Sequence, residues 1–386
     1  MPESDTAFAI CAPSMFDGAQ LLREHCIVVR RGAVESVQPT AECPAAMNKT
    51  VLATGTLAPG FVDLQVNGGG DLMFNNSPSE ATLVAMLDAH RATGTTAMMP
   101  TLISDTRERQ QQAVAAVRAA RAGGHAGILG VHLEGPHFDV SRRGAHLADM
   151  IRQATAEDIA WLCSLRDLKV IVTLAPEHAL PGQIRELAAS GIHVCAGHTS
   201  ASYEQIMAAV AEGLEGVTHL FNAMSPLASR APGTVGAALA QDSLWAGIIA
   251  DGHHVHPANI RLARQAKPAG RLVLVSDAMA TVGGSRDGFS LYGEEISRSA
   301  GKLVNRAGAL AGSAIGMIDA VGYCVRAVGI PLPECLRMAS LYPATILGLD
   351  HCMGRIARGY RADLVHFDEQ FSVRNTWLAG ERRQHA

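Results

Sequence analysis

The chain has 386 residues, too many for one small hydrophobic core and suited to one large domain with a minor one. Its hydrophobic content of 48% and charged content of 18% are typical of a globular protein and exclude a disordered chain. The net charge of −4 provides no broad positive field, so neither nucleic acid nor a membrane surface is an expected partner.

From its first residues we expect the sequence to carry no export signal. Met1-Pro-Glu-Ser-Asp5 is acidic and lacks the basic start and apolar stretch of a signal peptide. No apolar run approaches the roughly 18–20 residues needed to cross a bilayer. The eight cysteines are scattered without a Cys-x-x-Cys pair, so we expect reduced, mostly buried thiols rather than disulfides or metal ligands. These features predict a cytoplasmic protein.

The two ends of the chain differ from its middle. Residues 1–55 contain short alternating runs such as Cys26-Ile-Val-Val-Arg30, broken by turn residues. Residues 355–386 are similar and include the strand-like run Ala362-Asp-Leu-Val-His-Phe367. We predict that both ends together form a small β-sandwich domain, which flanks a catalytic domain of residues 56–354.

Between the ends, helix-like and strand-like segments alternate. Ser79 to His90 has apolar residues at helical spacing behind a candidate Ser cap, and Thr95 to Leu102 resembles a buried strand. Ser202 to Gly213 begins with another candidate cap and ends on glycine. Repeated strand–helix–strand units imply parallel strands with right-handed crossovers. The predicted fold is therefore an α/β protein built on a (β/α)8 TIM-type barrel.

Four short apolar runs each end on a residue that binds metals or carries protons. The runs begin at Gly127, Ile192, Gly216 and Leu272, and they end respectively at Glu134, His198, His219 and Asp277. In a (β/α)8 barrel the carboxyl ends of the strands and the following loops build the active site. These four side chains are therefore expected to converge.

Two imidazoles and one carboxylate suit a catalytic metal site, which typically has three protein ligands and an open position for water. Taken singly, each of these residues has an ordinary structural explanation. A histidine in a strand is often a core residue, and a glutamate at the end of a strand often anchors a loop. The shared position of Glu134, His198 and His219 favours a metal-dependent hydrolase. Asp277 would transfer the proton, with a helix cap at Ser276–Asp277 as the alternative.

Histidine is plentiful, at 16 residues, and several histidines fall in loops after these strands: His137, His146, His253, His254 and His256. Any one of them could polarise a substrate carbonyl, because a developing oxyanion needs a positioned donor. The pattern of residues does not choose among them.

Six segments carry a specific resemblance. They are Ala58-Pro-Gly-Phe-Val-Asp-Leu-Gln-Val-Asn-Gly68, Gly130-Val-His-Leu-Glu-Gly-Pro136, Ala196-Gly-His-Thr199, Val217-Thr-His-Leu-Phe-Asn-Ala-Met224, Ile249-Ala-Asp-Gly252 and Val275-Ser-Asp-Ala278. In this order they closely resemble the motifs of N-acetylglucosamine-6-phosphate deacetylases, a family within the amidohydrolase superfamily. The resemblance extends over nearly the whole chain.

This resemblance implies a role for each matching residue. Glu134, His198 and His219 match metal ligands, Asp277 matches the general base and acid, and His146 is assigned to polarising the acetyl carbonyl. The substrate-binding positions that it implies are Ala145, Asn222, Ala223, Arg230, His254, Leu310, Ala311 and Gly312. The implied cofactor is one divalent metal ion per subunit, Zn²⁺ first, with Fe²⁺ or another divalent ion also compatible with the ligands.

One departure from the wider superfamily concerns the number of metal ions. Many amidohydrolases carry His-x-His at the end of the first barrel strand, where this chain has Gln65 and Asn67. Amides are poorer ligands for a zinc-like ion than imidazole. We therefore predict a single catalytic metal, with His132 or His137 as the residues that could recruit a second.

The resemblance implies hydrolysis of N-acetyl-D-glucosamine 6-phosphate to D-glucosamine 6-phosphate and acetate by metal-activated water. It also implies a homodimer in which His254 or Arg230 contacts the phosphate in the neighbouring active site. The alternatives are the galactosamine epimer of the substrate, another amide, or a catalytically silent relative.

Overall fold

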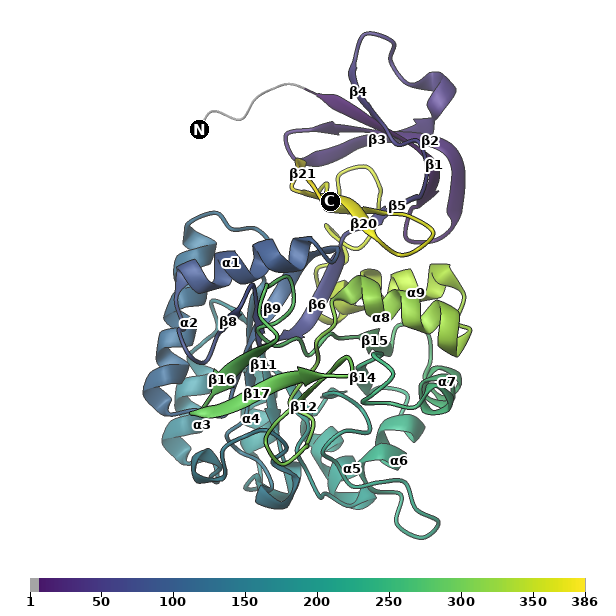
Figure 1. Cartoon of the computed structure of the whole chain (residues 1–386). Coiled ribbons are helices and arrows are strands. Elements are labelled where there is room, and N and C mark those ends of the chain that lie inside the picture. The colour runs from purple at the N-terminus through teal and green to yellow at the C-terminus, as the bar shows by residue number, and fades with distance from the viewer. Residues whose placement is uncertain (1–6, 386) are drawn as a thin grey trace.

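The computed structural model describes residues 7–385, and its centre is an eight-stranded parallel sheet (Figure 1). In spatial order its strands are β6 (Phe61–Val66), β9 (Thr95–Ile103), β10 (Gly130–Glu134), β11 (Lys169–Leu174), β12 (His193–Ala196), β13 (Gly216–Val217), β14 (Trp245–Ile248) and β15 (Leu272–Leu274). Just after β15 the chain returns to β6, where the Asp277 N–H donates to the Gln65 carbonyl at 3.0 Å. The predicted (β/α)8 barrel is confirmed.

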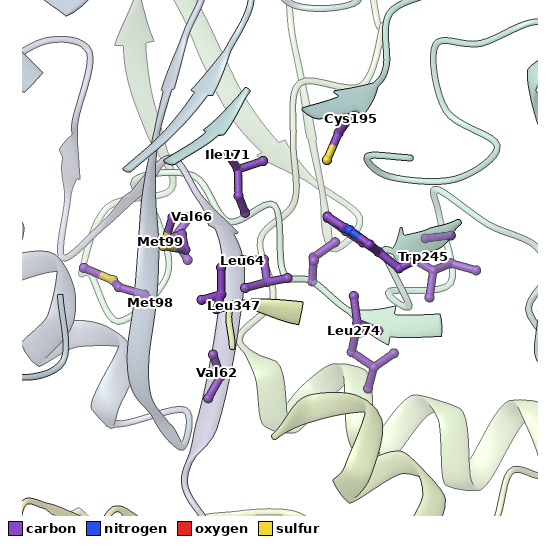
Figure 2. Packing of buried hydrophobic residues seen from close by; sticks show 14 of the residues in the cluster. Val62, Leu64, Val66, Met98, Met99, Ile171, Cys195, Trp245, Leu274 and Leu347 are labelled. Carbon is purple, nitrogen blue, oxygen red and sulfur yellow. The ribbon is translucent and has the colours of Figure 1, made fainter. Parts of the chain in front are cut away.

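Helices follow the barrel strands and cover them from outside. They are α1 (Glu80–Arg91), α2 (Arg107–Ala122), α3 (Ala156–Cys163), α4 (Gln183–Ala189), α5 (Tyr203–Glu212), α6 (Gly233–Ala240), α7 (Pro257–Ala266), α8 (Met317–Tyr323), α9 (Leu332–Ala339) and α10 (Leu341–Ile346). Every residue of β6 and β9 is buried, as expected for parallel strands covered on both faces. Figure 2 shows Val62 and Leu64 of β6 packed near Leu347 in this core.

The helix-end signals in the sequence correspond to real caps. Ser79 accepts the Thr82 N–H at 3.2 Å and begins α1. Ser202 and Gln205 form a reciprocal capping box at the start of α5, and Gly213 ends that helix with a φ of 113°. Glycine suits this position because residues with a Cβ are strained at positive φ.

Strands from both ends of the chain form a second sheet, drawn in purple and yellow in Figure 1. Its order is β21 (Glu381–Gln384), β20 (Val373–Leu378), β19 (Leu364–Phe367), β5 (Thr56–Pro59), β1 (Phe8–Phe16), β2 (Leu21–Arg30) and β3 (Ala33–Pro39), and β4 (Asn48–Val51) pairs with β1. All eight strands belong to one hydrogen-bonded sheet, and Trp377 lies in the cluster that one face buries. The sheet includes β5, so it continues beyond residue 55 to Pro59.

A small antiparallel sheet was not foreseen. It consists of β16 (Gly288–Leu291), β17 (Glu294–Ser299) and β18 (Lys302–Val304), and a two-stranded ribbon of β7 (Gly68–Gly69) and β8 (Leu72–Met73) lies nearby. Phe289 and Leu291 pack in one apolar cluster with Ile103 and Met279, two residues at the carboxyl end of the barrel. Within residues 7–385, no helix is both long and apolar enough to span a membrane.

Candidate active site

Three buried side chains meet where neighbouring barrel strands end. Glu134 is the last residue of β10, while His198 and His219 each lie two residues beyond β12 and β13. The Nε2 atom of His219 lies 3.0 Å from Glu134 Oε1 and 3.0 Å from His198 Nε2. His198 Nε2 is 3.4 Å from the same carboxylate oxygen. The convergence predicted from the four apolar runs is therefore present in the fold.

The backbone turns sharply at these strand ends. His198, His219 and Asp277 have φ angles of 49°, 36° and 50°, in the left-handed region that residues with side chains rarely occupy. Each such conformation costs roughly 1–3 kcal/mol and persists only where the surroundings enforce it. Three of the four functional residues at the strand ends thus share one strained geometry.

Neighbouring groups orient the cluster. His198 Nδ1 lies 2.9 Å from the Arg142 carbonyl, which only accepts, so Nδ1 carries the hydrogen and the Nε2 lone pair faces the cluster. The ring also stacks on Phe138 at a centroid distance of 4.4 Å. The Gln65 side chain donates to Glu134 Oε1 at 3.0 Å. Two imidazole nitrogens and a carboxylate oxygen held this way fit the ligand set of a zinc-like divalent ion.

Two buried carboxylates have pKa values shifted in opposite directions. Burial acts to raise the pKa of Glu134, but the adjacent imidazoles of His198 and His219 hold it well below its usual value. Burial and the nearby charge of Glu134 raise the pKa of Asp277 to about 6. The Asn67 side chain donates to Asp277 Oδ1 at 2.7 Å and acts in the other direction. Glu134 is thus suited to remain an anionic ligand, and Asp277 to exchange a proton.

His146 is arranged as a neutral hydrogen-bond donor. Its Nδ1 accepts the Ser104 N–H at 3.2 Å, so the hydrogen of the neutral ring is on Nε2. Burial, followed by the neighbouring His198, lowers the pKa of His146 well below its usual value. The two rings lie 4.4 Å apart. A neutral N–H next to the metal ligands suits stabilisation of a developing oxyanion.

These groups line one cavity of about 200 Å³. The predicted residues that line it are Glu134, Ala145, His146, His198, His219, Asn222, Ala223, His254, Asp277, Leu310 and Gly312. Ala311 does not line it, because its side chain is buried in the apolar cluster beneath β18. Arg230 does not line it either and lies exposed in the loop before α6.

Other residues at the site were missed as contributors. Ile103 and Met279 form apolar parts of the wall, and Asn67 contacts Asp277. Asn67 could have been identified from the sequence, because asparagine stands there in place of a histidine of the superfamily pattern. The apolar wall residues could not have been identified, because an apolar residue next to a strand end is as typical of the hydrophobic core as of an active site.

The two histidines considered for a second metal ion have other partners. His132 Nε2 lies 2.8 Å from Thr173 Oγ1, and its Nδ1 lies 3.2 Å from the Leu64 carbonyl. His137 Nδ1 lies 3.1 Å from the Arg152 carbonyl. Among the described residues, neither histidine belongs to a group of side chains that could hold an ion.

A model of the Amidohydrolase family matches residues 56–383. The chain belongs to this family. A relative from Shewanella sp., named N-acetylgalactosamine-6-phosphate deacetylase, is 42% identical over 375 residues, covering 95% of this chain and 94% of the relative. The N-acetylglucosamine-6-phosphate deacetylase of Haemophilus influenzae is 33% identical, with coverage of 94% and 96%.

Solved structures of this amidohydrolase branch are also similar. The N-acetylglucosamine-6-phosphate deacetylase of Pasteurella multocida has a TM-score of 0.95 at 36% identity, covering 98% of this chain and all of that one. A mutant of the Mycobacterium smegmatis deacetylase, in complex with N-acetyl-D-glucosamine-6-phosphate, has a TM-score of 0.89 at 31% identity and coverage of 98% and 99%. The family model thus covers residues 56–383, and the similarity to solved deacetylases extends over 98% of the chain.

The contact between Asn67 and Asp277 leads to a prediction about pH dependence. A general base acts only when it is ionised, so if Asp277 has this role, amide hydrolysis is expected above its pKa and is lost as the pH falls through that pKa. Replacing Asn67→Leu removes a bond that favours the carboxylate, and the acid limb of kcat/KM should move up by about one pH unit. The measurement is the pH profile of the variant beside the wild type.

Asn75→Leu provides a matched control. Asn75 is also buried, but its amide donates to the Ile103 carbonyl and to Asp105 rather than to Asp277. The acid limb of this variant should remain at the wild-type pH. An unchanged limb in Asn67→Leu would contradict the positioning role.

Proposed function

We propose that this amidohydrolase hydrolyses the N-acetyl group of N-acetyl-D-glucosamine 6-phosphate, giving D-glucosamine 6-phosphate and acetate. The observation that carries the proposal is the set of Glu134, His198, His219, His146 and Asp277 around one cavity. Relatives that match more than nine-tenths of the chain are named as deacetylases of acetylated hexosamine 6-phosphates, which supports the substrate class.

The proposed mechanism assigns one task to each group. Glu134, His198 and His219 would hold a divalent ion, which would supply polarisation of the amide carbonyl and a lowered pKa of water. The Asp277 carboxylate removes a proton from the attacking water and then delivers it to the departing amine nitrogen. The Nε2 hydrogen of His146 bonds the carbonyl oxygen as negative charge develops on it.

We propose a single ion per site, Zn²⁺ first among the divalent candidates. The amides that stand in place of the superfamily histidines are occupied as donors, Gln65 to Glu134 and Asn67 to Asp277. The side-chain nitrogens of both amides are engaged as donors, and their oxygens are poorer ligands for a zinc-like ion than imidazole. This arrangement supports one ion, as the substitution of imidazole by amide predicted.

Asp277→Asn tests the assignment of the base. The variant should retain metal content and substrate affinity, because it keeps the ligands and the shape of the side chain. Its kcat should fall by about 10²–10⁴, the usual contribution of general acid–base catalysis. Metal analysis, substrate binding and turnover on one preparation measure all three, and near-normal turnover would contradict the assignment.

The substrate phosphate requires a cation that this cavity does not supply. Among residues 7–385, no lysine or arginine lines the cavity. His254 does line it, and its Nδ1 lies 2.6 Å from Asp251 Oδ2. Because Arg230 is exposed away from its own cavity, we propose that the enzyme is a homodimer in which Arg230 binds the phosphate in the neighbouring site. His254 then acts within its own subunit.

Mixed dimers distinguish a contact in trans from one in cis. Asp277→Asn and Arg230→Ala chains are each expected to be defective alone. If Arg230 acts in trans, a mixed dimer combines the intact base of one chain with the arginine of the other. Random mixing should then restore about a quarter of wild-type activity at low substrate concentration. If Arg230 acts in cis, mixing restores nothing.

The galactosamine epimer is the second candidate substrate. The observation that favours it is the 42% identity to the Shewanella relative, above the 33% identity to the Haemophilus one. Both epimers present the same acetyl group and phosphate, so the residues of the mechanism serve either. The preference depends on the contacts made by the hydroxyl at C4 of the sugar.

Acetate release from both epimers, and from unphosphorylated N-acetylglucosamine, tests the substrate on metal-replete protein. We expect kcat/KM to be highest on N-acetyl-D-glucosamine 6-phosphate and reduced at least about 10²-fold without the phosphate. Faster release from the galactosamine epimer would reassign the sugar and leave the mechanism intact. Absence of release from all three would overturn the proposed function.

We also propose a cytoplasmic location. All eight cysteines are free thiols, and most are buried. Free thiols persist in a reducing compartment, where disulfides are rare.

A further inference from the structure

Three of the eight cysteines, which are scattered in the sequence and were expected to be buried thiols rather than metal ligands, converge on one face of the terminal sheet. Cys11 on β1 and Cys26 on β2 are register partners across the two strands, and Cys43 follows in the loop after residues 40–42. Their sulfur atoms all lie within 4.8 Å of one another. They are 3%, 0% and 8% exposed, so the group is closed from solvent.

We propose that Cys11, Cys26 and Cys43 form a second metal site, which binds one thiophilic cation of the zinc or copper(I) class. Three sulfurs that bind one ion at about 2.3 Å lie about 3.8–4.0 Å apart in tetrahedral or trigonal geometry. The Cys11 and Cys43 sulfurs are 4.0 Å apart. This separation equals the ligand spacing, whereas a disulfide would require an approach to about 2.0 Å.

The surroundings suit a soft ion. Met47 packs against the cluster that these cysteines form with Ala9, and we take its thioether as the candidate fourth ligand. Sulfur ligands favour thiophilic ions over hard ones such as Mg²⁺. The Nζ of Lys49 lies 3.5 Å from the Cys43 carbonyl, and its charge favours the thiolate of Cys11. A site of three thiolates and a divalent ion carries one net negative charge, which this ammonium group offsets.

Binding exchanges protons for the ion without any redox step. Burial and the neighbouring thiols raise the pKa of Cys26 to about 12, so this thiol is protonated before the ion arrives. As each metal–sulfur bond forms, an S–H bond breaks and its proton passes to solvent. Cys43 and Met47 lie on the same exposed loop, which gives the ion a route to the buried sulfurs.

Cadmium is a suitable probe, because its bonds to thiolates give an ultraviolet charge-transfer band. The amidohydrolase site has oxygen and nitrogen ligands, so cadmium bound there gives no such band. We expect titration of the reduced full-length protein to produce a band that saturates at one equivalent of thiolate-bound cadmium. In Cys43→Ser the affinity should fall by more than about tenfold, with deacetylase activity retained as the check on folding.

Cys335→Ser is the matched control. Cys335 is another buried thiol, and it contacts only Cys324 among the described cysteines, so it offers a pair rather than a triad. This variant should retain the cadmium band at full amplitude. The proposal would be overturned by the absence of a band in the wild type, by a cadmium affinity in Cys43→Ser equal to that of the wild type, or by a Cys11–Cys43 disulfide that persists under reducing conditions.

Discussion

The burial of the Glu134 carboxylate is the constraint on which the active site depends. A charged group that is 2% exposed is stable only when it is paired and hydrogen-bonded. His198, His219 and Gln65 supply those partners from three different strands. Because the same charge raises the pKa of Asp277, one carboxylate both holds the candidate metal site together and shifts the pKa of the proposed base.

The fold provides these partners through its geometry at the strand ends. Parallel strands bring their carboxyl ends to one rim, and the left-handed conformations of His198, His219 and Asp277 turn the chain immediately beyond that rim. Strain of this kind is stable only where the surrounding structure is rigid. The buried strands and their covering helices supply this rigidity, so the stability of the core and the geometry of the site are linked.

The strand-end residues were predictable from the sequence because each closes a short apolar run, and a parallel barrel admits only one place for such ends to meet. The helix caps at Ser79 and Ser202 were predictable for a similar reason, since their signal is local. The sheet of β16 to β18 was not, because its strands are short and mostly polar and are held by packing against Ile103 and Met279. Contacts between loops that are distant in the sequence, such as that of His198 with the Arg142 carbonyl, could not be predicted, because residue spacing does not encode them.

Residues on the inner face of β6 take part both in closing the barrel and in holding the candidate site residues. Side chains of alternate strand residues share a face, and Asp63, Gln65 and Asn67 are all buried. Asp63 accepts the Ser276 N–H at 3.2 Å, and the Gln65 carbonyl accepts the Asp277 N–H. The hydrogen bonds that close the barrel between its first and last strands therefore also fix the backbone of Asp277, the proposed base. The side-chain amides at positions 65 and 67 continue along this face and donate to Glu134 and Asp277. Amides at these two positions thus hold both carboxylates in place, where superfamily histidines would coordinate a second ion.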